Sequence, residues 1–136
     1  MHRRVVLCVD FDGCLCQHEF PRIGQIIQPA FDTLIKLQQQ IRTRLILWTC
    51  REPGQGLEEA VQFCHEHGLD FDTVNEGWAL MDGFALHKVI ADFYIDDRNI
   101  DWKDTKDEEL RWECIYRRVW DYHCKINGLN SLNVTK

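Results

Sequence analysis

Short apolar runs alternate with amphipathic stretches along most of this chain, and this alternation restricts the fold more than any other feature. The expected strands are residues 5–9, 45–48, 69–74 and 90–95, and the expected helices are 28–40, 55–67 and 108–126. In the helical stretches, apolar residues recur at three- and four-residue steps, as they do on one face of a helix. Strands that alternate with helices predict right-handed βαβ units and a mostly parallel sheet with helices on both faces.

Size and composition restrict the class of protein. The chain has 136 residues, of which 45% are apolar, so we expect one domain at 1–126 and a tail at 127–136. A net charge of −6 argues against a general binder of nucleic acid or of anionic membranes. No apolar run approaches the ~20 residues that span a bilayer. The N-terminal run lacks a signal cleavage site, and seven cysteines without such a signal indicate free thiols in the cytoplasm.

The first strand runs directly into two carboxylates, Asp10 and Asp12, and then into Gly13. Residues two apart on an extended strand point to the same face. Two acids side by side at the end of a buried strand repel each other unless a cation lies between them or one stays protonated. Considered alone, the stretch has a simpler alternative, which is a strand end followed by an Asx-type turn.

Three of the expected strands end in chemically capable residues. The first ends at Asp10 and Asp12, the second is followed by Thr49 and Arg51, and the fourth ends at Asp96-Asp97. In parallel α/β sheets, ligands bind outside the carboxyl ends of the strands, near the point where the strand order reverses. We therefore expect these residues to meet in one site at one edge of the sheet.

The residues expected in this site suit the chemistry of a phosphate ester. Several carboxylates around one point favour a hard divalent cation such as Mg²⁺. One Asp can act as a nucleophile, and a second can protonate the leaving oxygen and later activate a water molecule. Thr49 can donate to a phosphoryl oxygen, and Lys88 can neutralise the charge that spreads over those oxygens.

Four short motifs in order resemble those of the haloacid dehalogenase (HAD) superfamily. The hydrophobic strand with D-x-D-G matches residues 5–13, and the hydrophobic strand ending in Thr matches 45–49. The motif-three lysine matches Lys88, and the acidic pair of motif four matches Asp96-Asp97. A P-x-I-G loop at 21–24 and a W-T-x-R-E stretch at 48–52 are similar to those of a small group of bacterial and phage members.

The resemblance implies a Mg²⁺-dependent phosphatase that works through an aspartyl-phosphate on a three-layer Rossmann-like sheet. Asp10 would be the nucleophile and Asp12 the general acid and base, while Thr49 and Lys88 would bind the phosphoryl group. The implied metal ligands are Asp10, the backbone carbonyl of Asp12, Asp96 and Asp97, the last directly or through water. One departure stands out, because Cys14 occupies the place where the family usually has Thr.

Members of this family often carry an inserted cap that selects substrates, and here the connections are too short for one. We expect a capless member whose open site suits a large substrate, or one closed by a neighbouring subunit. The substrate class is a phosphorylated small molecule, such as a nucleotide or a sugar phosphate, and a phosphorylated macromolecule stays open. The residues expected to bind substrate are Gly13, His18, Arg22, Cys50, Arg51 and Asn75.

Several of these residues have simpler interpretations. His18 can be a solvated loop residue, and Arg51 can be an ion-pair partner of Glu52 or Glu58. The thiols of Cys14, Cys16 and Cys50 can bind a soft metal or can be buried free thiols. The tryptophans Trp102, Trp112 and Trp120 leave room for a dimer contact. The alternative to the enzyme is a non-catalytic or very slow module that binds a phosphate ligand on the same fold.

Overall fold

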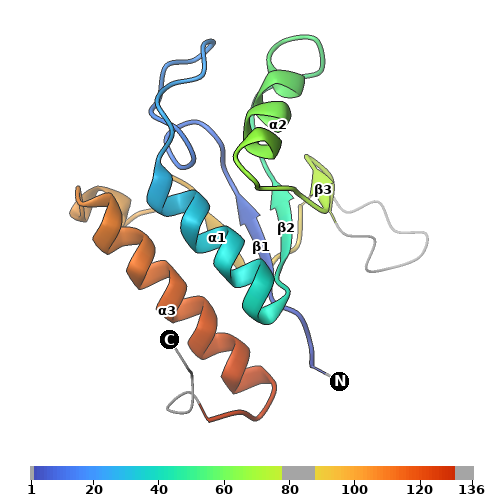
Figure 1. Cartoon of the computed structure of the whole chain (residues 1–136), viewed down its shortest axis with the longest axis vertical. Helices are drawn as coiled ribbons and strands as arrows, with labels where there is room; N and C mark the ends of the chain where they lie inside the picture. Colours follow the sequence, from blue (N-terminus) through green and yellow to red (C-terminus); the bar gives the residue numbers. More distant parts are fainter. Residues whose placement is uncertain (1, 78–87, 131–136) are drawn as a thin grey trace.

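The computed structural model describes residues 2–77 and 88–130 (Figure 1). The elements in chain order are β1 (Val6–Val9), α1 (Gln28–Ile41), β2 (Arg44–Leu47), α2 (Leu57–Glu66), β3 (Thr73–Val74), β4 (Phe93–Ile95), a 3-10 turn (Trp102–Asp104) and α3 (Glu108–Ile126). Each expected strand and helix is present. The end of α3 coincides with the expected end of the domain, and the predicted tail lies mostly outside the described residues.

The four strands form one parallel sheet in the order β3-β2-β1-β4. In the register, Leu7 of β1 lies between Leu45 of β2 and Phe93 of β4. From β1 the chain moves outward to β2 and β3, and then it returns past β1 to form β4. The strand order therefore reverses between β1 and β4, and this is the position where parallel sheets bind ligands. The prediction of a parallel α/β sheet is confirmed.

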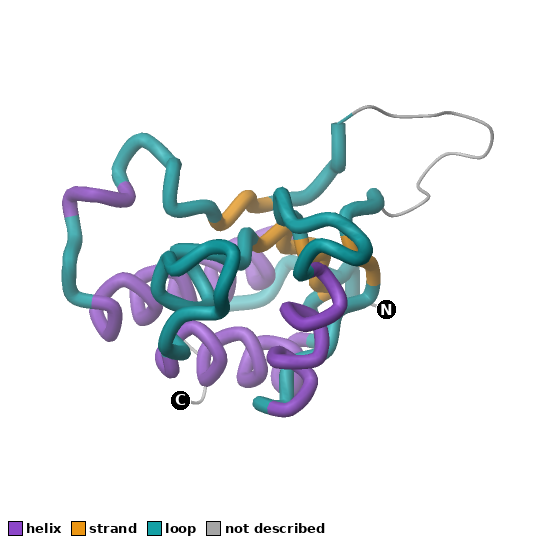
Figure 2. The backbone as a smooth tube through the Cα atoms, turned by 90° about the horizontal axis from the view of Figure 1, so that it is seen from above, coloured by secondary structure: helices purple, strands orange, loops and turns teal. Residues whose placement is uncertain are grey.

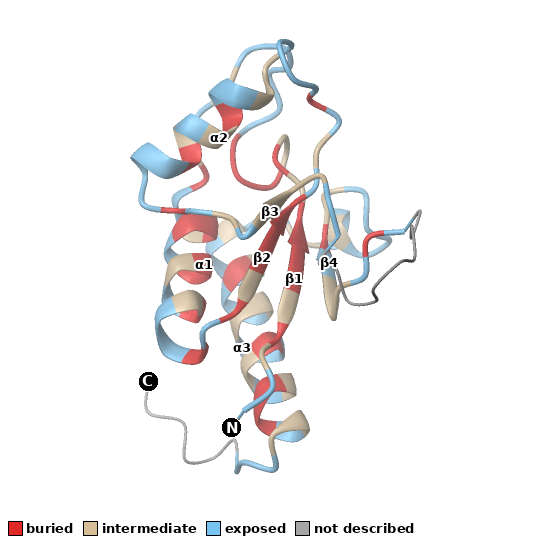
Figure 3. Ribbon diagram, turned by 90° about the vertical axis from the view of Figure 1, so that its right-hand side faces the viewer, coloured by how far each residue is buried: buried red, intermediate tan, exposed pale blue. Residues whose placement is uncertain are grey.

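All three α-helices pack on one face of this sheet (Figure 2). Leu7 and Val9 of β1 share a buried cluster with Leu34 of α1, Cys64 of α2 and Trp112 of α3. Figure 3 shows the buried central strands β1 and β2 facing the buried sides of the helices. The sequence predicted helices on both faces of the sheet and hence three layers. This prediction is wrong for the described residues, in which the helices cover one face.

Where the structure describes it, the connection from β3 back to β4 explains why the second face of the sheet carries loops in place of a helix. A right-handed return in that direction runs over the face opposite to α1 and α2. Its described parts, 75–77 and 88–92, are loops, and Val89 and Ala91 pack there against Cys8 and Ile46. The sequence of residues 75–85 predicts a loop with one helical turn, and most of this segment lies outside the described residues.

Two aspartates shorten the edge strands relative to the prediction. The Asp92 carboxylate accepts a hydrogen bond from Val6 N at 2.7 Å, and the Asp72 carboxylate accepts one from Leu45 N at 2.8 Å. In both places a side chain takes the acceptor position of a backbone carbonyl, so regular pairing starts only beyond the aspartate. As a result β3 begins at Thr73 and β4 at Phe93.

Within the described part of the chain, no helix is both apolar and long enough to cross a lipid bilayer.

Candidate functional site

The segment after β1 turns sharply at the carboxyl edge of the sheet. Asp10 N donates to Ile95 O of β4 at 2.9 Å, which holds the tips of the two strands together. Leu15 N donates to Phe11 O at 2.9 Å and closes the turn that carries Asp12 and Gly13. Phe11 is fully buried and packs edge-on against Phe63 of α2, with 6.0 Å between the ring centres. The buried ring anchors the turn, and the flanking carboxylates stay half-buried.

The tips of β1 and β4 bring four titratable groups together. Ligand atoms of Asp10, Cys14 and Asp97 lie within 4.8 Å of one another. Burial raises the pKa of Asp10 to about 8, and repulsion from Asp96 and the contact with Asp97 add to this rise. The same surroundings raise the pKa of the Cys14 thiol, mainly through burial. Asp10, Asp96 and Asp97 thus form an acidic cluster with uncompensated negative charge, next to a neutral thiol.

Gly13 is the residue that lets Asp97 approach so closely. Its φ of 89° is a left-handed conformation that favours glycine. A Cβ atom at this position would overlap the Asp97 carboxylate. Gly13 was expected to bind substrate, and its observed role is to make room for the acidic pair from β4.

The donors in the acidic cluster fit a hard divalent cation. Carboxylate oxygens are the ligands that Mg²⁺ prefers, and a cation between them would relieve the repulsion that raises the pKa of Asp10. The alternative soft-metal site of Cys14, Cys16 and Cys50 does not form. Cys14 and Cys16 are buried free thiols, whereas Cys50 is exposed. The simpler interpretation as buried free thiols therefore agrees with the structure for Cys14 and Cys16 but not for Cys50.

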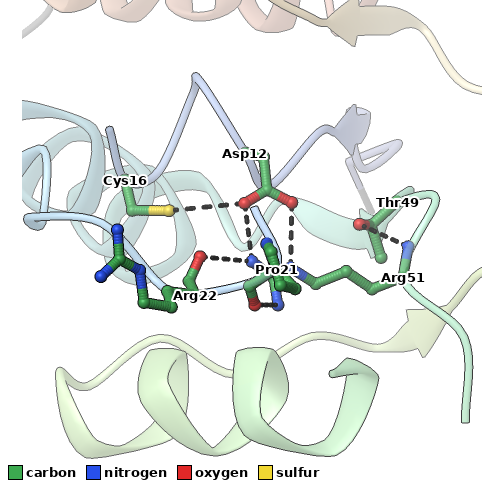
Figure 4. A network of polar contacts seen from close by, with 6 residues as sticks. All are labelled: Asp12, Cys16, Pro21, Arg22, Thr49 and Arg51. Atoms are coloured by element: carbon green, nitrogen blue, oxygen red, sulfur yellow. Dashed lines mark hydrogen bonds and ion pairs between the residues drawn. The ribbon is translucent and has the colours of Figure 1, made fainter. Parts of the chain in front are cut away.

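The end of β2 is held by Asn75. Thr49 N donates to Asn75 Oδ1 at 2.8 Å, and Asn75 Nδ2 donates to Arg51 O at 3.4 Å. The Thr49 hydroxyl accepts a hydrogen bond from Arg51 N at 3.2 Å and remains partly exposed (Figure 4). Asn75, which was expected to bind substrate, supports the loop that follows β2.

Arg51 turns inward, with only 1% of its surface exposed. Its Nε donates to Asp12 Oδ2 at 2.9 Å and its Nη2 to Asp12 Oδ1 at 2.8 Å (Figure 4). The interpretation as a substrate-binding residue does not match this buried position. The simpler interpretation as an ion-pair partner is right in kind, but the acid is Asp12 rather than Glu52 or Glu58. Gly56 leaves room for this inward position, because a Cβ atom there would lie 2.7 Å from Arg51 Nη1, and no signal in the sequence pointed to the pairing with Asp12.

Lys88 lies on the acidic face of the sheet but does not join the cluster. Its side chain is exposed, and its ammonium group lies 5.4 Å from the centre of the Tyr94 ring. Cys8 of β1 pairs with Tyr94 of β4. Asp10 lies two residues after Cys8 and Asp96 lies two residues after Tyr94, so all four side chains share one face of the sheet. The electrostatic contribution of Asp10 and Asp96 to the raised pKa of Cys8 agrees with this arrangement.

The remaining predicted site residues lie on the surface. His18 and Cys50 are exposed, and Arg22 pairs with Glu19 at 3.4 Å. These residues surround the turn after β1 without contacting the acidic cluster through any described hydrogen bond. Their role in substrate binding stays a prediction.

Comparison with known proteins gives one relative. No family model matches the chain, and no curated protein matches it. The structure of a conserved protein from Bacteroides thetaiotaomicron is 36% identical in sequence and has a TM-score of 0.72, over 94% of this chain and 99% of that chain. The chain belongs to the same family as this Bacteroides protein. The match extends over nearly the whole of both chains, so the two family members share the fold that carries the site.

Proposed function

We propose that this protein is a Mg²⁺-dependent phosphohydrolase that cleaves phosphate monoesters through an aspartyl-phosphate at Asp10. The observation that carries the proposal is the meeting of Asp10, Asp96 and Asp97 where the strand order reverses. The ordered motifs that resemble the HAD superfamily support it. Between β1 and α1 the chain has only a short connection, which agrees with a member that lacks a cap.

The proposed reaction has two steps. The Asp10 carboxylate attacks phosphorus, and the bond to the leaving oxygen breaks while Asp12 transfers a proton to that oxygen. A water molecule then attacks the aspartyl-phosphate, and Asp12 accepts its proton. Inorganic phosphate leaves, Asp10 is again a carboxylate, and Asp12 is again the carboxylic acid that it was at the start. Asp10 and Asp12 supply the nucleophile and the proton carrier from one turn, so no other titratable group is needed.

The remaining residues of the site would bind the metal ion, the phosphoryl oxygens and the rest of the substrate. Asp10, Asp96, Asp97 and the backbone carbonyl of Asp12 would hold Mg²⁺, which supplies positive charge for the phosphoryl oxygens. Thr49 would donate its hydroxyl to one of these oxygens. Lys88 would move from the Tyr94 ring toward the phosphoryl group, a change that its long exposed side chain permits. The exposed His18, Arg22 and Cys50 would contact the rest of a phosphorylated small molecule such as a nucleotide or a sugar phosphate.

Hydrolysis of an aryl phosphate, with Mg²⁺ and with a chelator, tests the proposal. We expect a rate that requires Mg²⁺ and that falls by more than about 10³-fold in Asp10→Asn, because the nucleophile is lost. Asp32→Asn is the matched control, since Asp32 is an exposed acid on α1 that pairs with Gln28 at 2.9 Å. A rate that survives both the chelator and Asp10→Asn would exclude this mechanism.

A binding module without catalysis is the second candidate. The position of Lys88 favours it, because the ammonium group rests on Tyr94 rather than beside the carboxylates. Calorimetry with inorganic phosphate and Mg²⁺ distinguishes the two candidates. Binding of phosphate in the absence of turnover on a panel of phosphate esters would support the module.

A further inference from the structure

A short flap lies between β1 and α1, and Arg51 is bonded to its tip. The flap comprises residues 16–27, and its base is closed by Ile27 N donating to Leu15 O at 2.9 Å and Gln17 N donating to Gln25 O at 2.8 Å. At the tip, the carbonyl oxygens of Pro21 and Arg22 accept hydrogen bonds from Arg51 Nη1 at 3.0 Å and Nη2 at 2.9 Å. One guanidinium therefore joins the flap to the end of β2.

Two aromatic rings lie close to the same guanidinium. Its central carbon lies 5.2 Å from the centre of the Phe11 ring and 5.1 Å from that of Phe20. Phe11 belongs to the turn after β1, and Phe20 belongs to the flap. Stacking of a guanidinium on aromatic rings is favourable and restricts its rotation. Hydrogen bonds to Asp12, Pro21 and Arg22 and the two nearby rings thus hold Arg51 in one orientation.

Asp12 is the only carboxylate bonded to Arg51 among the described residues. The two-point contact fixes the plane of the Asp12 carboxylate, because each oxygen accepts one N–H from a rigid fork. Asp12 Oδ1 also accepts a hydrogen bond from Cys16 Sγ at 4.0 Å, whereas Oδ2 accepts only the one from Arg51 Nε among the described residues. A carboxylate oxygen offers about two lone-pair positions, so Oδ2 keeps one for a proton or a substrate. Arg51 therefore restricts the orientation of Asp12 without occupying all its hydrogen-bonding capacity.

We propose that Arg51 is a positioning residue that orients the Asp12 carboxylate and couples this orientation to the closed position of the flap. The inference rests on the proposed function, in which Asp12 transfers a proton to the leaving oxygen. Proton transfer needs a donor at hydrogen-bond distance in the right geometry, so a freely rotating Asp12 would be a poorer acid. Substrate that displaces the flap would also disturb Asp12, and a closed flap would restore it.

The first test uses the dependence of the rate on the leaving group. An alkyl phosphate needs its leaving oxygen protonated, whereas an aryl phosphate with an acidic phenol needs this much less. We expect Arg51→Ala to lower kcat for the alkyl phosphate by about tenfold more than for the aryl phosphate, and Arg51→Lys to have a smaller effect of the same kind. Equal losses on both substrates would overturn the inference and leave the proposed function intact.

Arg111 gives a matched control for the loss of a buried arginine. Its guanidinium also stacks on an aromatic ring, that of Trp102, at 4.2 Å, and it bonds to Glu108 at 2.6 Å and to the backbone carbonyls of Trp102 and Thr105. These partners belong to the 3-10 turn, α3 and the segment that joins them, away from the turn after β1. Arg111→Ala should therefore reduce stability without changing the ratio of the two rates.

The second test does not need catalysis. Trypsin can cut the flap after Arg22, whose side chain is exposed. We expect Asp12→Ala to speed cleavage at this bond by about tenfold, because Arg51 loses its charged partner and holds the tip less firmly. Asp10→Asn leaves every hydrogen bond of Arg51 in place and should not change this rate. An unchanged rate of cleavage in Asp12→Ala would overturn the proposed coupling between Asp12 and the flap. Faster cleavage in Asp12→Ala, together with a wild-type protein that hydrolyses no phosphate ester, would overturn only the proposed phosphatase function.

Discussion

The raised pKa of Asp10 predicts how the stability of the protein depends on pH. Burial, with repulsion from Asp96 and the contact with Asp97, raises this pKa from 3.8 to about 8. An acid with a higher pKa in the folded chain than in the unfolded chain binds more protons when folded, at any pH between the two values. The contribution of Asp10 to the free energy of unfolding therefore falls as the pH rises from about 4 to about 8, and it is constant above that range.

Asp10→Asn removes the titration and keeps the size of the side chain. A rise of the Asp10 pKa from 3.8 to about 8 corresponds to about 6 kcal/mol at most. Asp10 is only partly buried, so screening by solvent lowers the expected effect to about 2 kcal/mol. Without a divalent cation, we expect the variant to match the wild type near about pH 4 and to be about 2 kcal/mol more stable near about pH 8.5.

Urea unfolding, followed by circular dichroism with chelator and reductant over a series of pH values, measures this difference. Groups that titrate alike in the wild type and in Asp10→Asn contribute equally to both free energies of unfolding, so their contributions cancel in the difference. Asp32→Asn serves as the control for removing an exposed acid. A stability difference that does not change with pH would refute the raised pKa of Asp10 and its cause, the burial of this carboxyl beside Asp96 and Asp97. Mg²⁺ at tenfold its dissociation constant should stabilise the wild type by about 1.4 kcal/mol, and Asp10→Asn by less.

Three further predictions concern single residues. Lys88→Ala should lower kcat for an aryl phosphate by about 10²-fold, because phosphoryl transfer depends on neutralising the negative charge of the phosphoryl oxygens. An unchanged kcat would show that Lys88 stays on the Tyr94 ring during turnover. Cys14→Ser should leave the pH dependence attributed to Asp10 unchanged in the same urea series, because the Cys14 thiol donates to Ile95 O at 3.9 Å and a serine hydroxyl can donate to the same carbonyl. A shift to lower pH would show that the hydroxyl donates to the acidic cluster instead. Asp92→Ala should cost about 2 kcal/mol in the free energy of unfolding, because it removes the acceptor of the part-buried Val6 N and the partner of Arg3 and Tyr122. Thermal denaturation that shows no loss of stability would contradict this prediction.

The sequence by itself determined the elements and the edge of the sheet at which the site lies. Apolar periodicity is a local property, and it predicted the limits of α3 and the start of α1 correctly. A parallel sheet brings all its carboxyl ends to one edge, so acids that follow β1 and β4 had to be neighbours once these strands paired. The meeting of Asp10 with Asp96 and Asp97 was therefore predictable without coordinates.

Only the tertiary structure decided which partner each long polar side chain takes. Arg51 and Asp12 are separated by 39 positions in the chain, and no local pattern distinguishes Asp12 from the nearer Glu52 and Glu58. The packing of Val89 and Ala91 on the sheet face opposite to the helices and the contact of Lys88 with Tyr94 likewise depend on how distant segments pack. Periodicity reports which side of an element is apolar, whereas a charged side chain chooses among acids by distance in space, and these distances exist only in the folded chain.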